Sequence, residues 1–158
     1  EWKKDGIRNA LISKGELEGG KLVLIKPQTF MNKSGLSVKD LQGSKSKLEK
    51  LVVLHDDLDL PLGSMKIVFN RGSGGHKGVE SIIRTVKSEA FARVRIGICP
   101  TTPSGKLKKP DHNKILDFIV GALKPAEMSE VKKISKKVSE ALEVLITESR
   151  EKAMTEFN

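Results

Sequence analysis

Residues 51–59 read LVVLHDDLD, in which an uninterrupted apolar run is followed at once by acidic side chains. A continuous run of Val and Leu is typical of a strand that is covered on both faces in an α/β protein. The runs KLVLIK at 21–26 and MKIVF at 65–69 predict two more strands, the first of them buried. The stretch RVRIGIC at 93–99 alternates polar and apolar residues, which predicts a strand with one polar face.

Helical segments are predicted between and after these strands. Asn32 or Ser34 can cap a short helix that runs to about Leu41, and a second helix follows the glycines at 71–78 and runs to about residue 87. Pro125 opens a long C-terminal helical region, 125–156. The side chains expected to face the core are Leu36, Val38 and Leu41 in the first helix and Met128, Val131, Ile134, Val138, Ala141, Leu142 and Leu145 in the last.

The order of these elements indicates the α/β class, because strands alternate with helices. We expect residues 1–158 to form a single domain, a three-layer α/β/α sandwich with a mixed, mostly parallel sheet. Residues 100–114, rich in Pro and Lys, are interpreted as a mobile basic loop and not as a domain boundary.

Positive charge is concentrated in the middle of the chain. Of the formal net charge of +9, residues 61–114 carry +8, from eleven Lys and Arg residues against three acids. Residues 121–158 are neutral, with seven basic and seven acidic side chains. A concentrated positive field attracts polyanions, of which nucleic acid is the commonest in the cytoplasm. The alternative, that the excess charge only keeps the protein soluble, stays open on charge alone.

The composition also limits the compartment. No apolar run approaches the ~20 residues that a membrane-spanning helix needs, and no secretory leader opens the sequence. We therefore expect a soluble, cytoplasmic protein that does not bind membranes. Cys99 is the sole cysteine, which excludes an internal disulfide and a zinc site built on several thiolates.

Polar clusters follow three of the predicted strands, at 29–32, 55–59 and 74–78. In an α/β sheet the downstream ends of parallel strands meet on one side, where ligands bind. We therefore expect the amide of Asn32, the carboxylate of Asp56 and the imidazole of His76 to open into one cleft with a positive rim.

Each acidic residue has a less specific interpretation beside the functional one. Asp56 can cap a loop, or it can hold a histidine in its basic tautomer. His55 is a poor partner for it, because adjacent residues of a strand point to opposite faces. Asp57 and Asp59 are a weak signal for a divalent metal, and we favour a role in a turn.

The glycine-rich stretch at 71–78 resembles a phosphate-binding loop but fails both fingerprints. A P-loop needs Gly-Lys followed by Ser or Thr, and the dinucleotide motif needs Gly where Lys77 stands. Gly74 and Gly75 can instead let the backbone approach a bulky ligand, while the helix start offers N–H donors to an anion. The alternatives are a plain turn, and a His76 that only packs or caps.

The first cluster has two interpretations as well. Asn32 can orient a peptide carbonyl or a water molecule, or it can cap the helix that follows. Phe30 and Met31 can wall an apolar pocket, although core packing is the default for both.

Five segments in the same order resemble the bacterial-type peptidyl-tRNA hydrolase family: KPQTFMNKSG (26–35), LVVLHDDLDLPLGSMKI (51–67), GSGGHKGVESI (72–82), FARVRIGI (91–98) and DFIVGALKPAE (117–127). The chain end AMTEFN (153–158) is similar to that family's chain end. The resemblance implies the family's fold and a cytoplasmic enzyme that cleaves the ester between a peptide and the terminal ribose of tRNA. It also implies a monomer that needs no metal or organic cofactor.

The resemblance implies roles for the matching residues. A histidine activates water, and Asp56 keeps that histidine basic. Asn32, flanked by Phe30 and Met31, holds the peptide and the attacking water, and His76 shapes the pocket. The residues expected to meet the acceptor stem and 3′ end of peptidyl-tRNA are Gly74, Gly75, Lys77 and Arg95.

Two features depart from the family pattern. Lys77 stands where the family's glycine loop usually has Asn, so a charged amine replaces a neutral amide. The family's first strand and its water-activating histidine match nothing in this sequence, since His55, His76 and His112 lie elsewhere. These departures favour the alternative of a catalytically silent domain that binds RNA or tRNA. A nucleotide-binding α/β domain is disfavoured, because both phosphate fingerprints fail.

Overall fold

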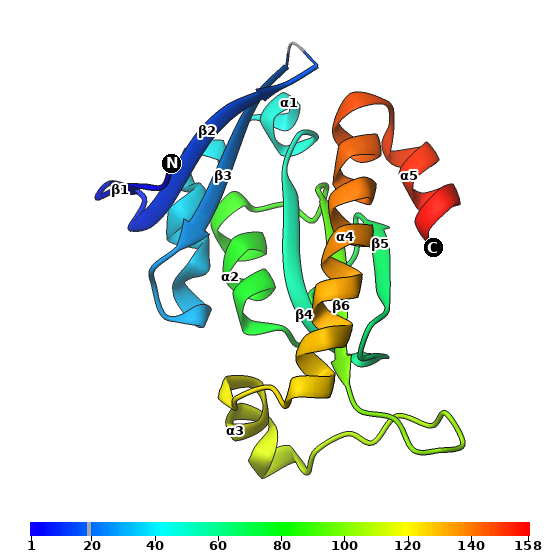
Figure 1. Cartoon of the computed structure of the whole chain (residues 1–158). Coiled ribbons are helices and arrows are strands. Elements are labelled where there is room, and N and C mark those ends of the chain that lie inside the picture. Colours follow the sequence, from blue (N-terminus) through cyan, green and yellow to red (C-terminus); the bar gives the residue numbers. More distant parts are fainter. Residues whose placement is uncertain (19) are drawn as a thin grey trace. The chain divides into compact units, whose positions relative to one another are not determined.

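The computed structural model describes residues 1–18 and 20–158, which form two compact units. Unit 1 contains residues 1–53 and 68–93, and unit 2 contains residues 54–67 and 94–158. Figure 1 labels the α-helices and the strands of both units.

Unit 1 begins with an antiparallel sheet of strands β1 (Lys3–Asp5), β2 (Ala10–Leu17) and β3 (Gly20–Pro27), in that order. The strand expected at 21–26 is confirmed, but its burial was predicted wrongly, since Val23 and Leu24 are 49% and 46% exposed. β3 is an outer strand of this sheet in the described residues, so an apolar run here does not imply cover on both faces. The sequence analysis missed β1 and β2, because their lysines and glycine hide the strand period.

Two helices of unit 1 pack closely against each other. They are the 3₁₀ helix η1 (Met31–Leu41) and α2 (Lys77–Val86), with the short α1 (Lys45–Leu48) between them in sequence. A Cβ on Gly35 would lie 2.4 Å from the Ser81 carbonyl oxygen, so only glycine permits this approach. The Gly35 N–H also donates to Ser81 Oγ at 3.0 Å. The core of unit 1 is Val38, Leu48, Val79, Ile82, Val86 and Phe91.

The start of η1 differs from the prediction. Its N-cap is Phe30, with no side-chain cap, so neither Asn32 nor Ser34 caps it. Ser34 Oγ instead donates to the Met31 carbonyl at 2.8 Å. Leu36 is 46% exposed and does not face the core, because a 3₁₀ helix repeats every three residues and shifts the inward face.

The second sheet has the order β4-β6-β5 and contains β4 (Val52–Pro61), β5 (Met65–Phe69) and β6 (Ala92–Cys99). β4 is parallel to β6, because Ala92 N–H donates to the Leu51 carbonyl and Leu62 N–H to the Cys99 carbonyl. β5 begins beside the end of β6, where Gly97 N–H donates to the Ser64 carbonyl, so this pair is antiparallel. The three strands are confirmed, and this second sheet is mixed as expected. In the described residues β4 and β6 are the parallel pair, so antiparallel pairing has a larger share than predicted.

The length of β4 corrects a second expectation. The strand does not end at Leu54 but continues through His55–Asp59 to Pro61, so these polar residues lie within the strand and not after it. The charged residues interrupt the apolar pattern but not the strand, so the pattern alone predicts an end that is too early. Leu54 is 45% exposed, so the apolar run is not covered on both faces throughout.

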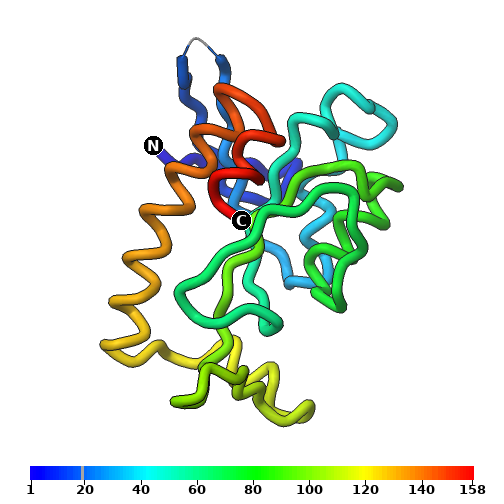
Figure 2. The backbone as a smooth tube through the Cα atoms, turned by 90° about the vertical axis from the view of Figure 1, so that its right-hand side faces the viewer, coloured from blue at the N-terminus to red at the C-terminus, as the bar shows by residue number. Residues whose placement is uncertain are grey.

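Unit 2 also holds the C-terminal helices η2 (His112–Lys114), α3 (Ile115–Val120), α4 (Pro125–Thr147) and α5 (Arg150–Phe157). Residues 100–124 lie at the N-terminal end of α4 (Figures 1 and 2). Pro125 opens α4 as predicted, and Ile134, Val138 and Ala141 are buried, but Met128 is 42% exposed in the first turn. None of the helices in the described residues is both long and apolar enough to cross a bilayer.

Candidate functional site

His76 caps the helix that follows the glycine loop. Its Nδ1 accepts hydrogen bonds from the N–H groups of Gly78 at 3.1 Å and Val79 at 3.2 Å. These two donors require an unprotonated Nδ1, so the neutral ring carries its proton on Nε2. His76 therefore caps α2 through its side chain, and its role in shaping a substrate pocket stays a prediction. Gly74 and Gly75 before it have φ of 62° and 85°, a region that favours glycine.

Met31 and His76 come together at Gly78. A Cβ on Gly78 would lie 2.5 Å from Met31 Sδ and 3.0 Å from His76 Cε1, so both side chains occupy the space that glycine leaves. The start of η1 and the start of α2 are thus side by side within unit 1. Phe30 is 81% exposed and Met31 55%, so neither side chain belongs to the core. Asn32 is exposed beside them.

Lys77 is the first residue of α2 and forms an ion pair with Glu80 at 3.1 Å, one turn further along the helix. Both side chains are largely exposed. A cation at a helix N-terminus opposes the helix dipole, and Glu80 in the same turn offsets this effect. The Lys77 ammonium group is therefore held near an acid of its own helix.

A second polar cluster lies in unit 2, around β4. His55 is buried, and its Nδ1 lies 2.7 Å from the carbonyl oxygen of the half-buried Asp56, to which it donates. Asp57 Oδ2 accepts from Arg95 Nε at 2.6 Å, and Asp57 Oδ1 accepts from Asp59 N–H at 2.7 Å. The bond to Asp59 N–H is the local contact expected of an Asp in a turn, although it forms here within a strand.

The Asp57 carboxylate is stabilised in its charged form. Burial by itself would raise the pKa of Asp57, but the hydrogen bonds from Arg95 and from Asp59 N–H outweigh it and lower the pKa below its ordinary value of 3.8. Arg95, expected to meet tRNA, is thus oriented by Asp57. Lys109, from the basic stretch at 100–114, pairs with Asp59 at 2.5 Å and so joins that stretch to β4.

Replacing Asp57 with Asn is expected to lower the free energy of unfolding by about 1–3 kcal/mol at pH 7, because a hydrogen bond to a charged group is lost. The lowered pKa means that this contribution is present above pH 3.8 and is lost as pH falls through the lower, folded-state value. Urea unfolding of both proteins from pH 7 to pH 2 measures the difference, which should shrink on acidification. A difference that stays constant or grows at low pH would contradict the assignment.

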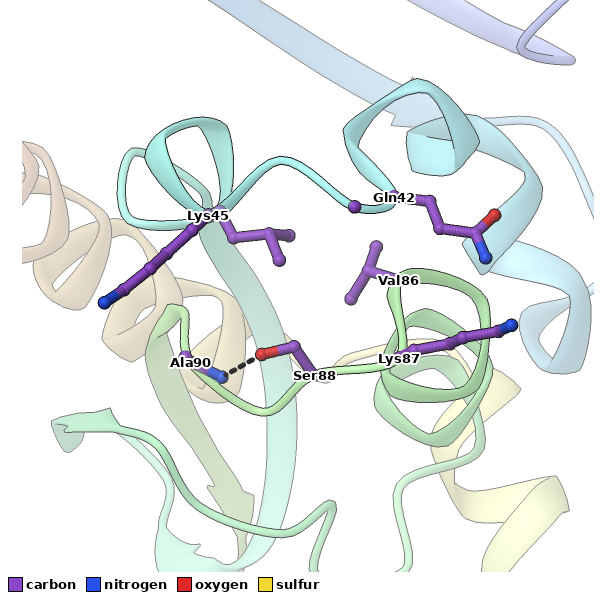
Figure 3. Close-up of a pocket in the computed structure, with 8 residues that line it drawn as sticks. Gln42, Lys45, Val86, Lys87, Ser88 and Ala90 are labelled. Carbon is purple, nitrogen blue, oxygen red and sulfur yellow. Dashed lines mark hydrogen bonds between the residues drawn. The ribbon is translucent and has the colours of Figure 1, made fainter.

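A cavity of about 350 Å³ lies at the other end of α2 from His76 (Figure 3). It is lined by Gln42, Gly43, Lys45, Leu48, Val86, Lys87, Ser88 and Ala90. The ammonium groups of Lys45 and Lys87 point away from it, and Ser88 Oγ already accepts from Ala90 N–H at 3.0 Å. The cavity contains none of the predicted site residues.

Comparison with known proteins assigns the chain to a family. The family model described as peptidyl-tRNA hydrolase matches residues 1–158. The chain belongs to the peptidyl-tRNA hydrolase family. It is 37% identical over 151 residues to the peptidyl-tRNA hydrolase of Geotalea uraniireducens, covering 95% of this chain and 74% of that one. It is 40% identical over 153 residues to the peptidyl-tRNA hydrolase of Thermodesulfovibrio yellowstonii, covering 93% and 75%.

Solved structures agree with this assignment. The crystal structure of peptidyl-tRNA hydrolase from Acinetobacter baumannii matches with a TM-score of 0.83 and 26% identity, covering 100% of this chain and 76% of that one. The predicted α/β fold of the peptidyl-tRNA hydrolase family is thereby confirmed. The chain spans about three quarters of the length of the relatives that it matches.

The predicted site residues of this peptidyl-tRNA hydrolase family member divide between the units. Unit 1 carries Phe30, Met31, Asn32, Gly74, Gly75, His76 and Lys77, and unit 2 carries Asp56 and Arg95. The structure brings Met31 and His76 together in unit 1, and in unit 2 it pairs Arg95 with Asp57, which follows Asp56 in β4. The expectation that Asn32, Asp56 and His76 share one cleft stays a prediction.

Sequence reasoning missed Arg93. The alternation in β6 predicts that Arg93 lies on a polar face, yet it is only 4% exposed. Its Nη2 donates to the carbonyl oxygens of Arg71 at 3.2 Å and Gly72 at 2.7 Å. No pattern in the sequence distinguishes a buried arginine that binds backbone carbonyls from one that faces water.

Proposed function

We propose that this protein hydrolyses the ester bond between peptide and tRNA in peptidyl-tRNA and so recycles tRNA in the cytoplasm. The observation that carries the proposal is the match of the peptidyl-tRNA hydrolase family model along residues 1–158. The proposed enzyme acts as a monomer, without a metal or an organic cofactor. Among residues 1–18 and 20–158, no group of three or more His, Cys, Asp or Glu side chains is arranged to hold a metal ion.

The proposed reaction is attack by water on the ester carbonyl carbon. A histidine takes a proton from the water, the bond from the carbonyl carbon to the ribose oxygen breaks, and that oxygen receives a proton. Free peptide and tRNA result. Asp56 supports the histidine in its basic tautomer, and Asn32 donates to a peptide carbonyl and accepts from the water. These roles are proposals that rest on the family resemblance.

The start of α2 supports a role in binding tRNA. The positive end of its dipole follows the loop of Gly74 and Gly75 in the chain, where an RNA phosphate can approach the backbone. We propose that Lys77 and Arg95 add positive charge on the acceptor stem and 3′ end. His76 caps this helix and thereby fixes the direction of its N–H groups.

A catalytically silent RNA-binding domain is the second candidate function, because Lys77 places a charged amine where the family pattern has a neutral amide. Purified chain, alone and extended by the N-terminal segment of a longer relative, should be incubated with peptidyl-tRNA. We expect ester cleavage by the extended form and retention of tRNA on a filter by both. Retention without cleavage in both forms would favour the silent domain.

Phe30 offers a test of the substrate surface. Its side chain is 81% exposed, so Phe30→Ala should leave the unfolding midpoint unchanged. Loss of a Phe that becomes buried against the peptide should lower kcat/KM about 10–100-fold, as expected from about 1.5–3 kcal/mol of burial. Ile7→Ala, at a side chain that is 97% exposed, is the matched control and should change neither quantity. Equal kcat/KM in the two variants would show that Phe30 does not touch substrate.

A further inference from the structure

Arg93 is a buried cation that donates two hydrogen bonds to a loop. It lies at the second residue of β6, is 4% exposed, and donates from Nη2 to the carbonyls of Arg71 and Gly72. Burying a charge is costly unless hydrogen bonds compensate for it. Charge-assisted bonds to carbonyl oxygens contribute to that compensation, and one guanidinium nitrogen has two N–H groups to offer.

The loop that Arg93 contacts connects β5 to His76 through an irregular backbone. Asn70, Gly74 and Gly75 all have positive φ, so the segment cannot be held by a regular hydrogen-bond ladder. Its second half is fixed locally, because His76 N–H donates to the Ser73 carbonyl and Gly75 N–H donates to Ser73 Oγ. The bonds from Arg93 are made to the first half.

We propose that Arg93 is a positioning residue for substrate binding, which acts by fixing residues 71–72 so that Gly74, Gly75 and His76 are presented in one conformation. This inference rests on the proposed function, in which the glycine loop meets tRNA. Arg93 contacts the carbonyl oxygens of the loop backbone and acts through them, so its role is to limit the loop's conformations before substrate arrives. Lysine cannot replace it, because one ammonium on a flexible stem lacks the planar, forked geometry of guanidinium.

Three variants separate positioning from a general loss of stability. Arg93→Lys keeps the charge, Arg93→Ala opens a space that methylguanidinium can fill, and Arg84→Lys makes the same change at an exposed position of α2. The readouts are amide hydrogen exchange at residues 73–77, and kcat and KM for peptidyl-tRNA. For Arg93→Lys we expect exchange and KM to rise about 10-fold, with kcat within about 3-fold, as for loss of a charge-assisted hydrogen bond.

The control and the rescue make the outcome decisive. Arg84→Lys should behave as the unaltered protein, and methylguanidinium, but not methylammonium, should restore slow exchange and low KM in Arg93→Ala. Unchanged loop exchange in folded Arg93→Lys, or a fall in kcat at constant KM, would overturn the proposal. If neither Arg93 variant folds, the unaltered protein provides the test. NMR couplings from Arg93 Nη2 to the Gly72 carbonyl carbon would support the contact, and their absence would refute it.

Failure of the proposed function gives a different result. If no form of the unaltered protein cleaves peptidyl-tRNA, the hydrolase proposal fails. Amide hydrogen exchange at residues 73–77 and the Kd for uncharged tRNA still test whether Arg93 positions the loop. If the unaltered protein is fully active and Arg93→Lys behaves like Arg84→Lys, only the proposed role of Arg93 is refuted.

Discussion

Replacing Asp56 with Asn is expected to lower kcat for peptidyl-tRNA cleavage by about 10²–10⁴-fold, the range that positioned acid–base groups contribute. The substitution keeps the shape of the side chain and removes the charge that holds a histidine in its basic tautomer. The Kd for tRNA should stay within about 3-fold, because a carboxylate makes no favourable contact with phosphate. Single-turnover cleavage and filter binding, on the form of the protein that cleaves, measure the two effects separately.

The matched control for this variant is Asp117→Asn. Asp117 is an exposed acid of α3, so its replacement removes one negative charge from unit 2 at a distance in sequence from β4. Any change in tRNA affinity that comes only from net charge should appear in both variants. A proportional loss of kcat and tRNA affinity in Asp56→Asn alone would assign Asp56 to binding and not to support of a base.

The sequence predicted most elements of the fold because their residue patterns are local. The strands at 65–69 and 93–99, the helix after the glycines and the helix opened by Pro125 all appear in the structure. What failed depends on pairing and packing. β2 is a strand because it pairs with β3 on one side and β1 on the other, and its own sequence, ALISKGEL, shows no strand period. The open side of β3 is likewise a property of the sheet and not of KLVLIK.

The candidate site divides in the same way between local and non-local information. The capping role of His76 depends on residues two and three positions later, and the sequence analysis included it as an alternative. The bond from Arg95 to Asp57 joins two strands that are 38 residues apart, and Arg93 reaches back across 21 and 22 residues to the loop. A single sequence contains no signal for such pairs, so a predicted RNA-binding arginine and a buried positioning arginine look alike in RVRIGIC.

Gly35 is the position at which one methyl group is expected to do most damage to unit 1. A Cβ there would lie 2.2 Å from Thr85 Oγ1, 2.4 Å from the Ser81 carbonyl oxygen and 2.9 Å from the Ser81 carbonyl carbon. The Thr85 side chain can rotate away, but the Ser81 atoms are backbone of α2 and cannot move without shifting the helix. Gly35→Ala should therefore lower the free energy of unfolding by about 1–3 kcal/mol, the usual cost of overpacking, or by more.

A shift of η1 away from α2 should also reach the proposed substrate surface. Met31 and Asn32 lie one turn before Gly35, and the Met31 side chain packs against Gly78. KM for peptidyl-tRNA should rise in the fraction of Gly35→Ala that stays folded, as shown by urea unfolding and steady-state kinetics on the same sample. Gly15→Ala is the control. It also replaces a glycine by alanine, in β2, but the added Cβ would meet nothing within 4 Å. That control should be neutral or more stable, because Ala reduces the freedom of the unfolded chain. Equal stability in the two variants would mean that η1 and α2 are not held at the distance that makes glycine necessary.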